Sequence, residues 1–571
     1  MKNTALSLLM LCSSISIHAQ KPHRYEVVIN EIMANPSGTS LLPNSKYIEL
    51  LNVSATAIDL YDWKISDGIN TAIIKEHFQL FPDSCVIICP AVNAPSFSAL
   101  GTAIGVTRFP SLRVNGDLIW LQSANDAIMH AVNYKRDWYK NEVKSAGGWS
   151  LEMTDPYNPC GGDNNWSASN DSRGGTPGTA NSIAGSNPDR DAPQLLHAYT
   201  TDSLHIMVIL NEPADSAHAA IISNYTISDR VSIAAATPLP PLFDRVLLTL
   251  AHPLQKRKLY TLNGNHITDC SGNPIVNNSF VQTGIDELPV KGDLIINEIL
   301  FNPPADGADY VELYNRSPYP IDLQNLFIAN RNSSGNIANL KQLSSEKLLI
   351  LPAAYLTVTD NAAIVQRQYL VKKPQWLIEI SSLPSFPNAS GTVVLLNNTG
   401  DIIDELQYNE KWHYELIGNY KGVALERISF YGATQDPNNW HSAAASAGYG
   451  TPTYQNSQFA LGNDIKGEVN LSPRIFSPDN DGFDDYLLVN YRFPENGFVC
   501  NITIFDSKGR TIRHLVRNGL CGTEGYYKWD GLDENYQALP MGIYIVFTEV
   551  FHPSGKTKKF KQAITLARRR T

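Results

Sequence analysis

The feature that most constrains this chain is an internal repeat, which is clearest in one short apolar stretch. Residues 27–36 read V-V-I-N-E-I-M-A-N-P, and residues 294–303 read L-I-I-N-E-I-L-F-N-P. Each copy is a β-prone apolar run that carries an Asn-Glu pair in its middle. Each copy also stops at Asn-Pro, which is typical of a strand that ends in a turn. The repeat predicts that the chain contains one folded unit twice.

Further sequence matches follow in the same order in both halves of the chain. The first half continues with Y-I-E-L-L-N, A-I-D-L, W-S-L-E, N-N-W and G-T-P, at residues 47–52, 57–60, 149–152, 164–166 and 175–177. The second half continues with Y-V-E-L-Y-N, P-I-D-L, V-A-L-E, N-N-W and G-T-P, at residues 310–315, 320–323, 423–426, 438–440 and 450–452. We therefore expect two copies of one module, at residues 24–182 and 291–456.

The order of these elements resembles the lamin-tail domain, an Ig-like β-sandwich that occurs in nuclear lamins and in many bacterial secreted proteins. A single element would be a weak signal. Six elements in one order, found twice in one chain, make the resemblance specific. It implies that both modules fold as β-sandwiches.

The segment between the two modules also has the pattern of a β-sandwich. Short alternating runs stand at residues 203–210, 224–227, 246–250 and 259–262. This spacing predicts one Ig-like domain at residues 190–285. The motifs N-E-P, N-Y, Y-T-L and D-C-S-G-N within this segment are similar to the Ig-like domain that is repeated in bacterial surface-layer proteins.

The last segment, residues 466–567, has an opening and a closing motif. F-S-P-D-N-D-G-F-D-D stands at residues 476–485, and W-D-G-L-D and L-P-M-G-I-Y stand at residues 529–533 and 539–544. The arrangement resembles the Ig-like domain of the flagellar hook-capping protein. It is also similar to the gliding-motility-associated C-terminal domains that address proteins to type IX secretion. The resemblance implies a sorting domain whose partner is the export machinery.

The predicted fold class is all-β, a string of four Ig-like β-sandwich domains with polar linkers at residues 182–192 and 456–468. The composition agrees, because 37 Gly, 34 Pro and 26 Tyr supply turn-forming and β-prone residues. The net charge of -10 disfavours nucleic acid as the principal partner. Affinity for nucleic acid depends mainly on neutralising phosphates with basic side chains.

The first residues have the features of an export signal. An apolar run at residues 5–11 and the small residue Ala19 predict a signal peptide at residues 1–19, cleaved after Ala19. Leu11 precedes Cys12, where a lipoprotein signal would need a small residue. No later run approaches the roughly 20 apolar residues that a membrane-spanning helix requires. We expect a secreted or outer-surface protein without a transmembrane segment.

Six cysteines follow the predicted signal peptide: Cys85, Cys89, Cys160, Cys270, Cys500 and Cys521. An even number in an exported chain permits disulfides. Cys85 and Cys89 stand in one predicted strand, where their Cα atoms would be about 13 Å apart, so we expect two packed thiols there. Cys500 and Cys521 flank a predicted hairpin, and that position is compatible with a disulfide or with two free thiols.

One loop has part of a calcium-binding pattern. Positions 1, 3, 5, 6 and 9 of the pattern are taken by Ser477, Asp479, Asp481, Gly482 and Asp485. Closely spaced oxygen ligands and a Gly at the sharp turn are what calcium loops need. Position 12 is Leu488, where a bidentate Glu would normally stand. The alternative is a solvated acidic turn whose side chains accept local backbone hydrogen bonds.

Four repeated glutamates are candidates for paired catalytic carboxylates, as in a glycosidase: Glu31, Glu49, Glu298 and Glu312. However, each occurs once per copy of a structural repeat, and Asn precedes two of them. A buried polar group must be hydrogen-bonded, so we expect a polar network inside each sandwich. The sequence favours a structural role over catalysis.

The tryptophans and the absence of catalytic motifs also favour a structural role over catalysis. Trp149, Trp166 and Trp440 would suit a carbohydrate-binding platform, but core packing is the favoured interpretation. The sequence has no H-E-x-x-H, no G-x-S-x-G, no P-loop and no dinucleotide fingerprint. We therefore expect a protein without catalytic residues or a certain cofactor, with calcium as the one candidate ion.

The sequence thus predicts a non-enzymatic exported protein with a structural or adhesive role, which presents its sandwich faces to a surface protein, an extracellular protein or a glycan. Two alternatives remain. One is a carbohydrate-binding or glycan-degrading protein, which a cleft with exposed Trp and Tyr beside two carboxylates would support. The other is an accessory to an extracellular nuclease, because lamin-tail domains accompany such enzymes in other bacterial chains. The acidic balance counts against the nuclease.

Overall fold

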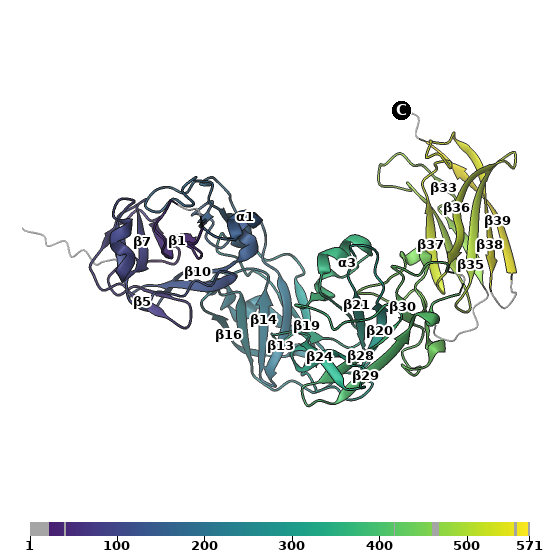
Figure 1. Cartoon of the computed structure of the whole chain (residues 1–571), viewed down its shortest axis with the longest axis horizontal. Helices are drawn as coiled ribbons and strands as arrows, with labels where there is room; N and C mark the ends of the chain where they lie inside the picture. Colours follow the sequence, from purple (N-terminus) through teal and green to yellow (C-terminus); the bar gives the residue numbers. More distant parts are fainter. Residues whose placement is uncertain (1–21, 39–40, 416, 460–466, 553–556, 569–571) are drawn as a thin grey trace, which may run out of the picture. The chain divides into compact units, whose positions relative to one another are not determined.

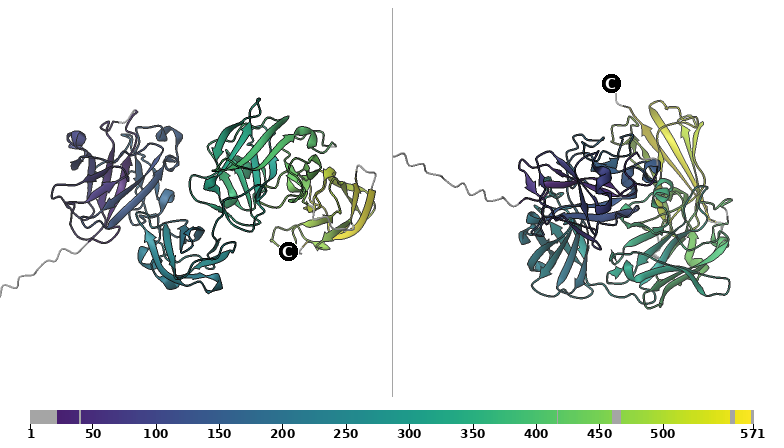
Figure 2. Two further views of the ribbon diagram at one scale, coloured as in Figure 1. Left: turned by 90° about the horizontal axis from the view of Figure 1, so that it is seen from below. Right: turned by 60° about the vertical axis from the view of Figure 1, so that its left-hand side comes forward.

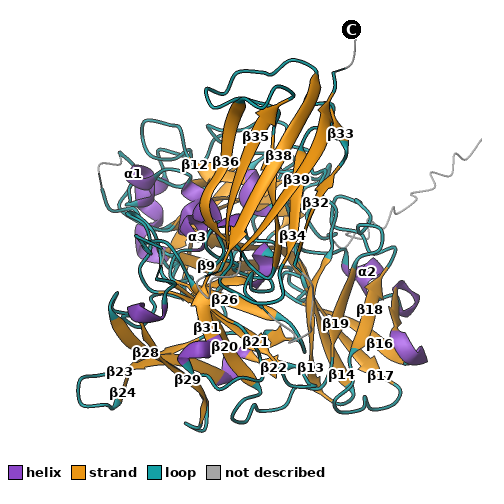
Figure 3. Ribbon diagram, turned by 90° about the vertical axis from the view of Figure 1, so that its right-hand side faces the viewer, coloured by secondary structure: helices purple, strands orange, loops and turns teal. Residues whose placement is uncertain are grey.

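The computed structural model describes residues 22–38, 41–415, 417–459, 467–552 and 557–568. The predicted signal peptide lies outside these residues. The described chain is mostly β and forms several separate sheets, which confirms the all-β fold class (Figures 1 and 3). Among the described residues, no helix is both long and apolar enough to cross a membrane.

The chain divides into two compact units. One unit comprises His205–His252 and Thr261–Val281 together with the described residues that precede Ala198. The other comprises Ala198–Leu204, Pro253–Tyr260 and the described residues from Gln282 onward.

The first module contains a six-stranded sheet in the order β12-β11-β1-β2-β7-β8 and a four-stranded sheet in the order β10-β9-β4-β5. The strands of the larger sheet are β1 (Val27–Met33), β2 (Tyr47–Asn52), β7 (Cys85–Pro90), β8 (Ala103–Val106), β11 (Leu151–Met153) and β12 (Trp166–Ala168). Those of the smaller sheet are β4 (Lys64–Ser66), β5 (Thr71–Ile73), β9 (Gly116–Gln122) and β10 (Ile128–Lys135). The short strands β3 (Ile58–Asp59) and β6 (Gln79–Leu80) pair with each other.

The core of the first module lies where these two sheets pack. Ile29 is on β1 of the larger sheet, and Ile65 and Leu121 are on β4 and β9 of the smaller sheet. None of these three side chains has any exposed surface. Burying one such aliphatic side chain stabilises the fold by roughly 1.5–3 kcal/mol. In the smaller sheet, β9 and β10 pair antiparallel across a short turn.

The second module repeats this arrangement. Its larger sheet has the order β27-β26-β21-β20-β30-β31, and its smaller sheet has the order β24-β23-β28-β29. The strands of the larger sheet are β20 (Leu294–Leu300), β21 (Tyr310–Asn315), β26 (Tyr355–Thr359), β27 (Leu377–Glu379), β30 (Leu425–Arg427) and β31 (Trp440–Ser442). The remaining strands are β22 (Ile321–Asp322), β23 (Leu326–Arg331), β24 (Ile337–Gln342), β25 (Leu349–Ile350), β28 (Ser390–Asn397) and β29 (Ile402–Asn409).

The Ig-like region has two smaller sheets, in the orders β13-β14-β17-β16 and β15-β18-β19. Its strands are β13 (Leu195–Asp202), β14 (His205–Leu210), β15 (Tyr225–Ile227), β16 (Ile233–Leu239), β17 (Arg245–Leu250), β18 (Tyr260–Gly264) and β19 (Phe280–Thr283). The four alternating runs that predicted this region correspond to β14, β15, β17 and β18.

The last region, yellow in Figure 2, has a three-stranded sheet, β32-β34-β37, and a five-stranded sheet, β33-β39-β38-β35-β36, which share one core. The strands are β32 (Glu468–Ser472), β33 (Ile475–Phe476), β34 (Leu487–Arg492), β35 (Val499–Asp506), β36 (Thr511–Leu520), β37 (Glu524–Trp529), β38 (Gly542–Phe551) and β39 (Thr557–Leu566). Trp529 and Ile504 are fully buried between the two sheets.

Candidate functional site

Three glutamates lie side by side on neighbouring strands in each module. In the first module, Glu31 on β1 is in register with Glu49 on β2 and with Glu152 on β11. All three have no exposed surface. We call these residues the first triad. Carboxyl groups are almost never fully buried unless they are paired, so such a row needs an explanation.

The second module has the same row, which we call the second triad. Glu298 on β20 is in register with Glu312 on β21 and with Glu426 on β30, and all three are fully buried. The repeat in the sequence therefore places six glutamates in two equivalent clusters.

A bulge at the Asn of each Asn-Glu pair sets the position of the triad. The pairing of β1 with β2 passes from Ile29 to Glu31, so that Asn30 has no partner in the register. The second module skips Asn297 in the same way. A bulge re-aims the side chain of the extra residue, and here the amide of Asn30 donates to Oε1 of Glu49 at 3.0 Å.

The central glutamate of the first triad accepts three hydrogen bonds on one oxygen. Oε1 of Glu31 lies 2.6 Å from the hydroxyl of Tyr47, 2.6 Å from Oγ of Ser150 and 2.9 Å from the backbone nitrogen of Thr176. These donors come from segments that are far apart in the sequence. The carboxyl group of Glu31 therefore links three separate segments of the module.

One segment after the last strand supplies most of the remaining donors, and we call residues 175–183 the first strap. The backbone N–H of Gly178 donates to Glu49 at 2.6 Å. The hydroxyl groups of Thr176 and Ser182 donate to the two oxygens of Glu152, at 2.9 and 2.7 Å. The triad therefore holds the strap across the sheet.

The second strap, residues 450–458, binds its triad through equivalent atoms. The backbone N–H of Thr451 donates to Glu298 at 2.9 Å, and that of Thr453 donates to Glu312 at 2.6 Å. Oγ of Ser457 donates to Glu426 at 2.8 Å.

An asparagine fixes each strap to the bulge. The amide of Asn181 donates to the backbone oxygens of Asn30 and Met153, at 3.0 and 2.8 Å, and its own oxygen accepts from the amide of Asn30 at 3.0 Å. Asn456 makes the corresponding contacts to Asn297 in the second module. The straps thus close the same polar network twice.

This geometry corrects one sequence interpretation. Ser182 and Asn456 were predicted as the last residues of the modules and the first of the linkers, but the straps that contain them continue to residues 183 and 458. Gln458 is also fully buried, and its backbone N–H donates to Glu426 at 2.8 Å. Ser182 donates to Glu152, and the side chain of Asn456 bonds to Asn297 and to the backbone oxygen of Arg427. Polar composition suggested linkers because the sequence does not reveal these partners.

Burial changes the protonation of the triads. Desolvation raises the pKa of Glu31 to about 8 and that of Glu49 to about 7. Desolvation likewise raises the pKa of Glu426 to about 8 and raises the pKa of Glu298. The hydroxyl of Thr451 lies 2.7 Å from an oxygen of Glu298 and 2.9 Å from one of Glu426. It has one hydrogen to donate, so the second hydrogen bond requires a proton on a carboxyl group.

The predicted polar network inside each sandwich is therefore confirmed for Glu31, Glu49, Glu298 and Glu312. The third glutamates were predicted only as parts of repeat motifs, and the asparagine and serine of the straps were not predicted. The sequence contained a signal for them: N-S follows each G-T-P motif, at residues 181–182 and 456–457.

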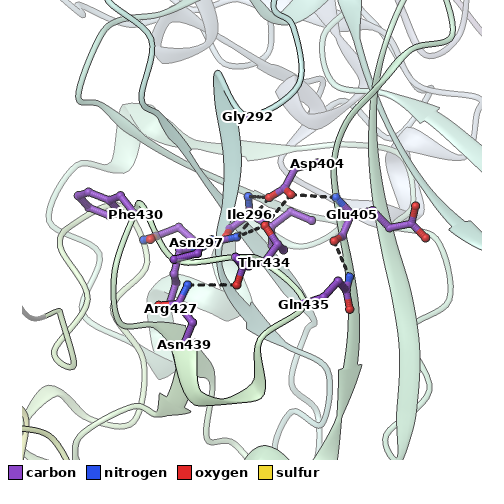
Figure 4. A network of polar contacts seen from close by, with 12 residues as sticks. Gly292, Ile296, Asn297, Asp404, Glu405, Arg427, Phe430, Thr434, Gln435 and Asn439 are labelled. Carbon is purple, nitrogen blue, oxygen red and sulfur yellow. Dashed lines mark hydrogen bonds and ion pairs between the residues drawn. The ribbon is translucent and has the colours of Figure 1, made fainter.

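Beside the second triad, the second module contains a buried ion pair (Figure 4). The Arg427 side chain is 1% exposed and lies 3.3 Å from Oδ2 of Asp404. Its Nε donates to the backbone oxygen of Ile296 at 2.7 Å, and Asp404 accepts from the Ile296 N–H at 2.9 Å. Thr434 donates to the other oxygen of Asp404 at 2.7 Å. Desolvation lowers the pKa of Arg427 to about 10.

The first module has neutral residues at the matching positions. His130 replaces Asp404, and Met153 replaces Arg427. Nδ1 of His130 accepts from the Ile29 N–H at 2.9 Å, so its Nε2 carries the hydrogen and donates to the Pro159 oxygen at 2.9 Å. His130 is fully buried, and desolvation lowers its pKa to about 4.

The candidate calcium loop brings three carboxylates together. Oxygens of Asp479, Asp481 and Asp485 lie within 4.8 Å of one another. The backbone N–H groups of Asn480 and Gly482 donate to Asp485, at 2.7 and 2.9 Å. Oxygens at this spacing can hold a hard cation, but the loop is equally satisfied as an acidic turn. Calcium binding here stays a prediction.

Among the described cysteines, Cys160 and Cys270 form a disulfide with Cα atoms 6.4 Å apart, which joins the first module to the Ig-like region. This pair was not predicted from the sequence. Cys85 and Cys89 are free thiols, as expected, and Cys500 and Cys521 are also free and buried.

The tryptophans follow the core-packing prediction. Trp166 and Trp440 are only 2% and 3% exposed. Trp149 is partly buried against the first core, with Nζ of Lys144 at 4.5 Å from its ring centre. None of these three rings offers the exposed platform that carbohydrate binding would need.

The sequence of each module has known relatives. The Lamin Tail Domain family matches residues 20–136 and 288–410. These ranges include two glutamates of each triad and end before the third glutamate and the strap. No curated protein matches the sequence.

Several solved structures are similar to parts of the chain. The S-layer protein rSbsC is 10% identical over 66% of this chain and 54% of its own, with a TM-score of 0.16. A DUF4876 family protein from Bacteroides thetaiotaomicron is 12% identical over 33% and 78%, with a TM-score of 0.18. PorZ, a surface component of the type-IX secretion system of Porphyromonas gingivalis, is 11% identical over 80% and 56%, with a TM-score of 0.15.

The chain spans about half the length of the surface-layer structures that it matches. TM-scores this low assign no function to this chain. The family match and the repeated geometry agree on one point: the chain contains two lamin tail domain copies, at residues 20–136 and 288–410.

Proposed function

We propose that this protein is a non-enzymatic, exported surface or extracellular protein with a structural or adhesive binding role. The observation that carries the proposal is the use of the six triad carboxyl groups. They are the repeated acidic clusters of the chain, all are fully buried, and the strap binds to them. A catalytic carboxyl group must reach substrate, whereas these groups support the scaffold.

The disulfide supports the extracellular part of the proposal. Disulfides persist in oxidising compartments and are rare in the cytosol. Cys160 and Cys270 are 110 residues apart in the sequence, so their bond fixes one region of the chain to another. Such a bond suits a protein that must remain folded outside the cell.

The last region is proposed as the sorting domain that the type IX export machinery recognises. The test is a cell fractionation that follows the intact chain and a version truncated after Phe459, which keeps the second strap complete. We expect the intact chain at the surface or in the medium and the truncated chain in the periplasm. Arrival of both at the surface would contradict the sorting role, and retention of the intact chain in the cytoplasm would contradict the whole proposal.

A further inference from the structure

The second compact unit contains a cleft of about 1180 Å³. One wall is the outer face of the sheet β32-β34-β37. The opposite wall comes from the second module, where the second strap and the end of α3 (Ala362–Gln368) contribute side chains. The feature expected to support carbohydrate binding was a cleft with exposed Trp and Tyr beside two carboxylates, and this cleft has Tyr, Glu468 and Glu524 in its lining but no Trp.

Hydrogen bonds hold the two walls of this cleft together. Oγ1 of Thr523 donates to the Phe459 oxygen at 2.7 Å, and the backbone N–H of Thr523 donates to the Ser457 oxygen at 3.1 Å. The hydroxyl groups of Ser446 and Tyr491 also bond to each other. Because Ser457 is itself bound to Glu426, the second triad anchors one wall of the cleft.

The sheet wall presents a row of amide and phenol groups. Asn490 on β34 is in register with Asn470 on β32 and with Tyr526 on β37. Their side chains lie on the outer face, because side chains alternate along a strand and Val469, Val489 and Trp529, which stand at the opposite alternation, are buried in the core. Tyr526 is 48% exposed.

A second row on the same wall carries charge. Arg492 on β34 is in register with Glu468 and Glu524, and its Nη2 lies 3.1 Å from the carboxylate of Glu524. On the opposite wall, Nζ of Lys372 lies 3.9 Å from the ring centre of Tyr454. These two cations and two anions balance one another, so the cleft has no net charge to attract an acidic polymer.

We propose that this cleft binds a neutral glycan. Amide side chains both donate and accept hydrogen bonds, which suits ligands that are covered with hydroxyl groups. Tyrosine rings offer apolar faces together with a polar hydroxyl, which suits the mixed apolar and polar surface of a sugar ring. The cleft is also large enough for several sugar units, since drug-sized ligands occupy pockets of about 300–1,000 Å³.

A peptide is the less favoured occupant. Extended peptides commonly bind by adding a strand to an open sheet edge, whereas this cleft is lined by side chains from the face of a sheet. The proposal rests on the proposed surface role, because it names the ligand class of that binding function.

The test is an array of neutral oligosaccharides, acidic oligosaccharides and immobilised gelatin, probed with the intact protein and three variants. Tyr526→Ala and Asn490→Ala remove groups from the sheet wall. Tyr431→Ala is the matched control, because Tyr431 is 83% exposed on the second module and does not line the cleft. Thermal unfolding of each variant checks that the fold is intact.

We expect the intact protein to bind at least one neutral oligosaccharide, and we expect each sheet-wall variant to bind it about tenfold more weakly. The Tyr431→Ala variant should bind as the intact protein does. Binding to no neutral sugar, binding only to acidic sugars or gelatin, or full binding by the sheet-wall variants would overturn the inference. An exported chain that binds no glycan would overturn this inference and leave the proposed surface role in place.

Discussion

The two lamin-tail modules share a polar network built around the buried glutamates and differ in how they satisfy one backbone group beside it. Both modules bury a glutamate triad, place a bulge at the same Asn and close the cluster with a strap. Beside the triad, the first module has His130 and Met153, whereas the second has Asp404 and Arg427. The shared glutamates bind the strap, whereas the differing pair of residues provides the acceptor for a separate backbone N–H group.

That backbone group is the N–H of the residue before the bulge. A buried N–H needs an acceptor, and the Ile29 N–H donates to His130 in the first module. In the second module the Ile296 N–H donates to Asp404, whose charge is then balanced by Arg427. One requirement is met by a neutral side chain in one module and by an ion pair in the other.

The largest expected effect comes from breaking the ion pair. Asp404→Leu should lower the free energy of unfolding of the second module by about 3–5 kcal/mol, because it leaves the buried Arg427 without a counterion. Asp404→His combined with Arg427→Met installs the residues of the first module and should recover most of that loss. Chemical denaturation of the intact chain, with hydrogen exchange to assign the affected module, measures both. If the double variant is as unstable as Asp404→Leu, the two pairs of residues are not interchangeable.

The disulfide gives the next largest effect, and it should be confined to the first compact unit. Replacing Cys160 and Cys270 by Ala should lower its stability by roughly 3 kcal/mol, because the bond closes a long loop in the unfolded chain. Thermal unfolding with and without a reducing agent measures the loss. The reducing agent should have no further effect on the variant. A larger loss of stability in the second compact unit than in the first would contradict this assignment of the disulfide's effect.

A pH effect distinguishes the two pairs of residues. The pKa of His130 is lowered to about 4 in the folded chain, so the unfolded chain binds the proton first as the pH falls below about 6.5. The stability that the neutral imidazole supplies is present above that pH and is lost as the pH falls toward 4. Between pH 7 and pH 5 the contribution of His130 alone to the stability of the first module should fall by about 2 kcal/mol, and the difference between the wild type and a non-titrating variant isolates it from the opposite contribution of Glu31 and Glu49.

The control for this effect is His130→Gln. Glutamine keeps an acceptor for the Ile29 N–H and a donor for the Pro159 oxygen but does not titrate in this range. Hydrogen exchange of β1 and β10 should therefore become less sensitive to acid in the variant. The acid response of the second module should be the same in the variant and the wild type. The substitution lies in the first module, and the buried histidine of the second module, His413, stands at a different position. Equal acid sensitivity in the variant and the wild type would contradict the assigned role of His130.

The sequence revealed the repeat, the strands and the burial of four glutamates, because these depend on local pattern. Each Asn-Glu pair stands inside an apolar strand, and a repeated polar pair of that kind must be satisfied internally. The sequence did not reveal that Glu152 joins Glu31, because β11 is more than a hundred residues away and its register depends on the assembled sheet. The full extent of the straps was not predicted for the same reason, since the partners of a polar side chain are set by tertiary structure.

The disulfide was also beyond sequence reasoning. Cys160 and Cys270 stand in different regions, and six cysteines allow many pairings. The cleft beside Tyr526 depends on side chains from both walls, and neither wall alone has a distinctive motif. The sequence therefore predicted the parts of the scaffold better than the places where those parts meet.

The most direct test of this account is hydrogen exchange of the two straps in the intact chain and in Glu31→Ala and Glu298→Ala. If the triads hold the straps, Glu31→Ala should speed amide exchange in residues 175–183 by about 100-fold, and Glu298→Ala should do the same in residues 450–458. Each substitution should leave the strap of the other module unchanged. Straps that exchange at the wild-type rate in both variants would contradict the claim that the buried glutamates are scaffold groups.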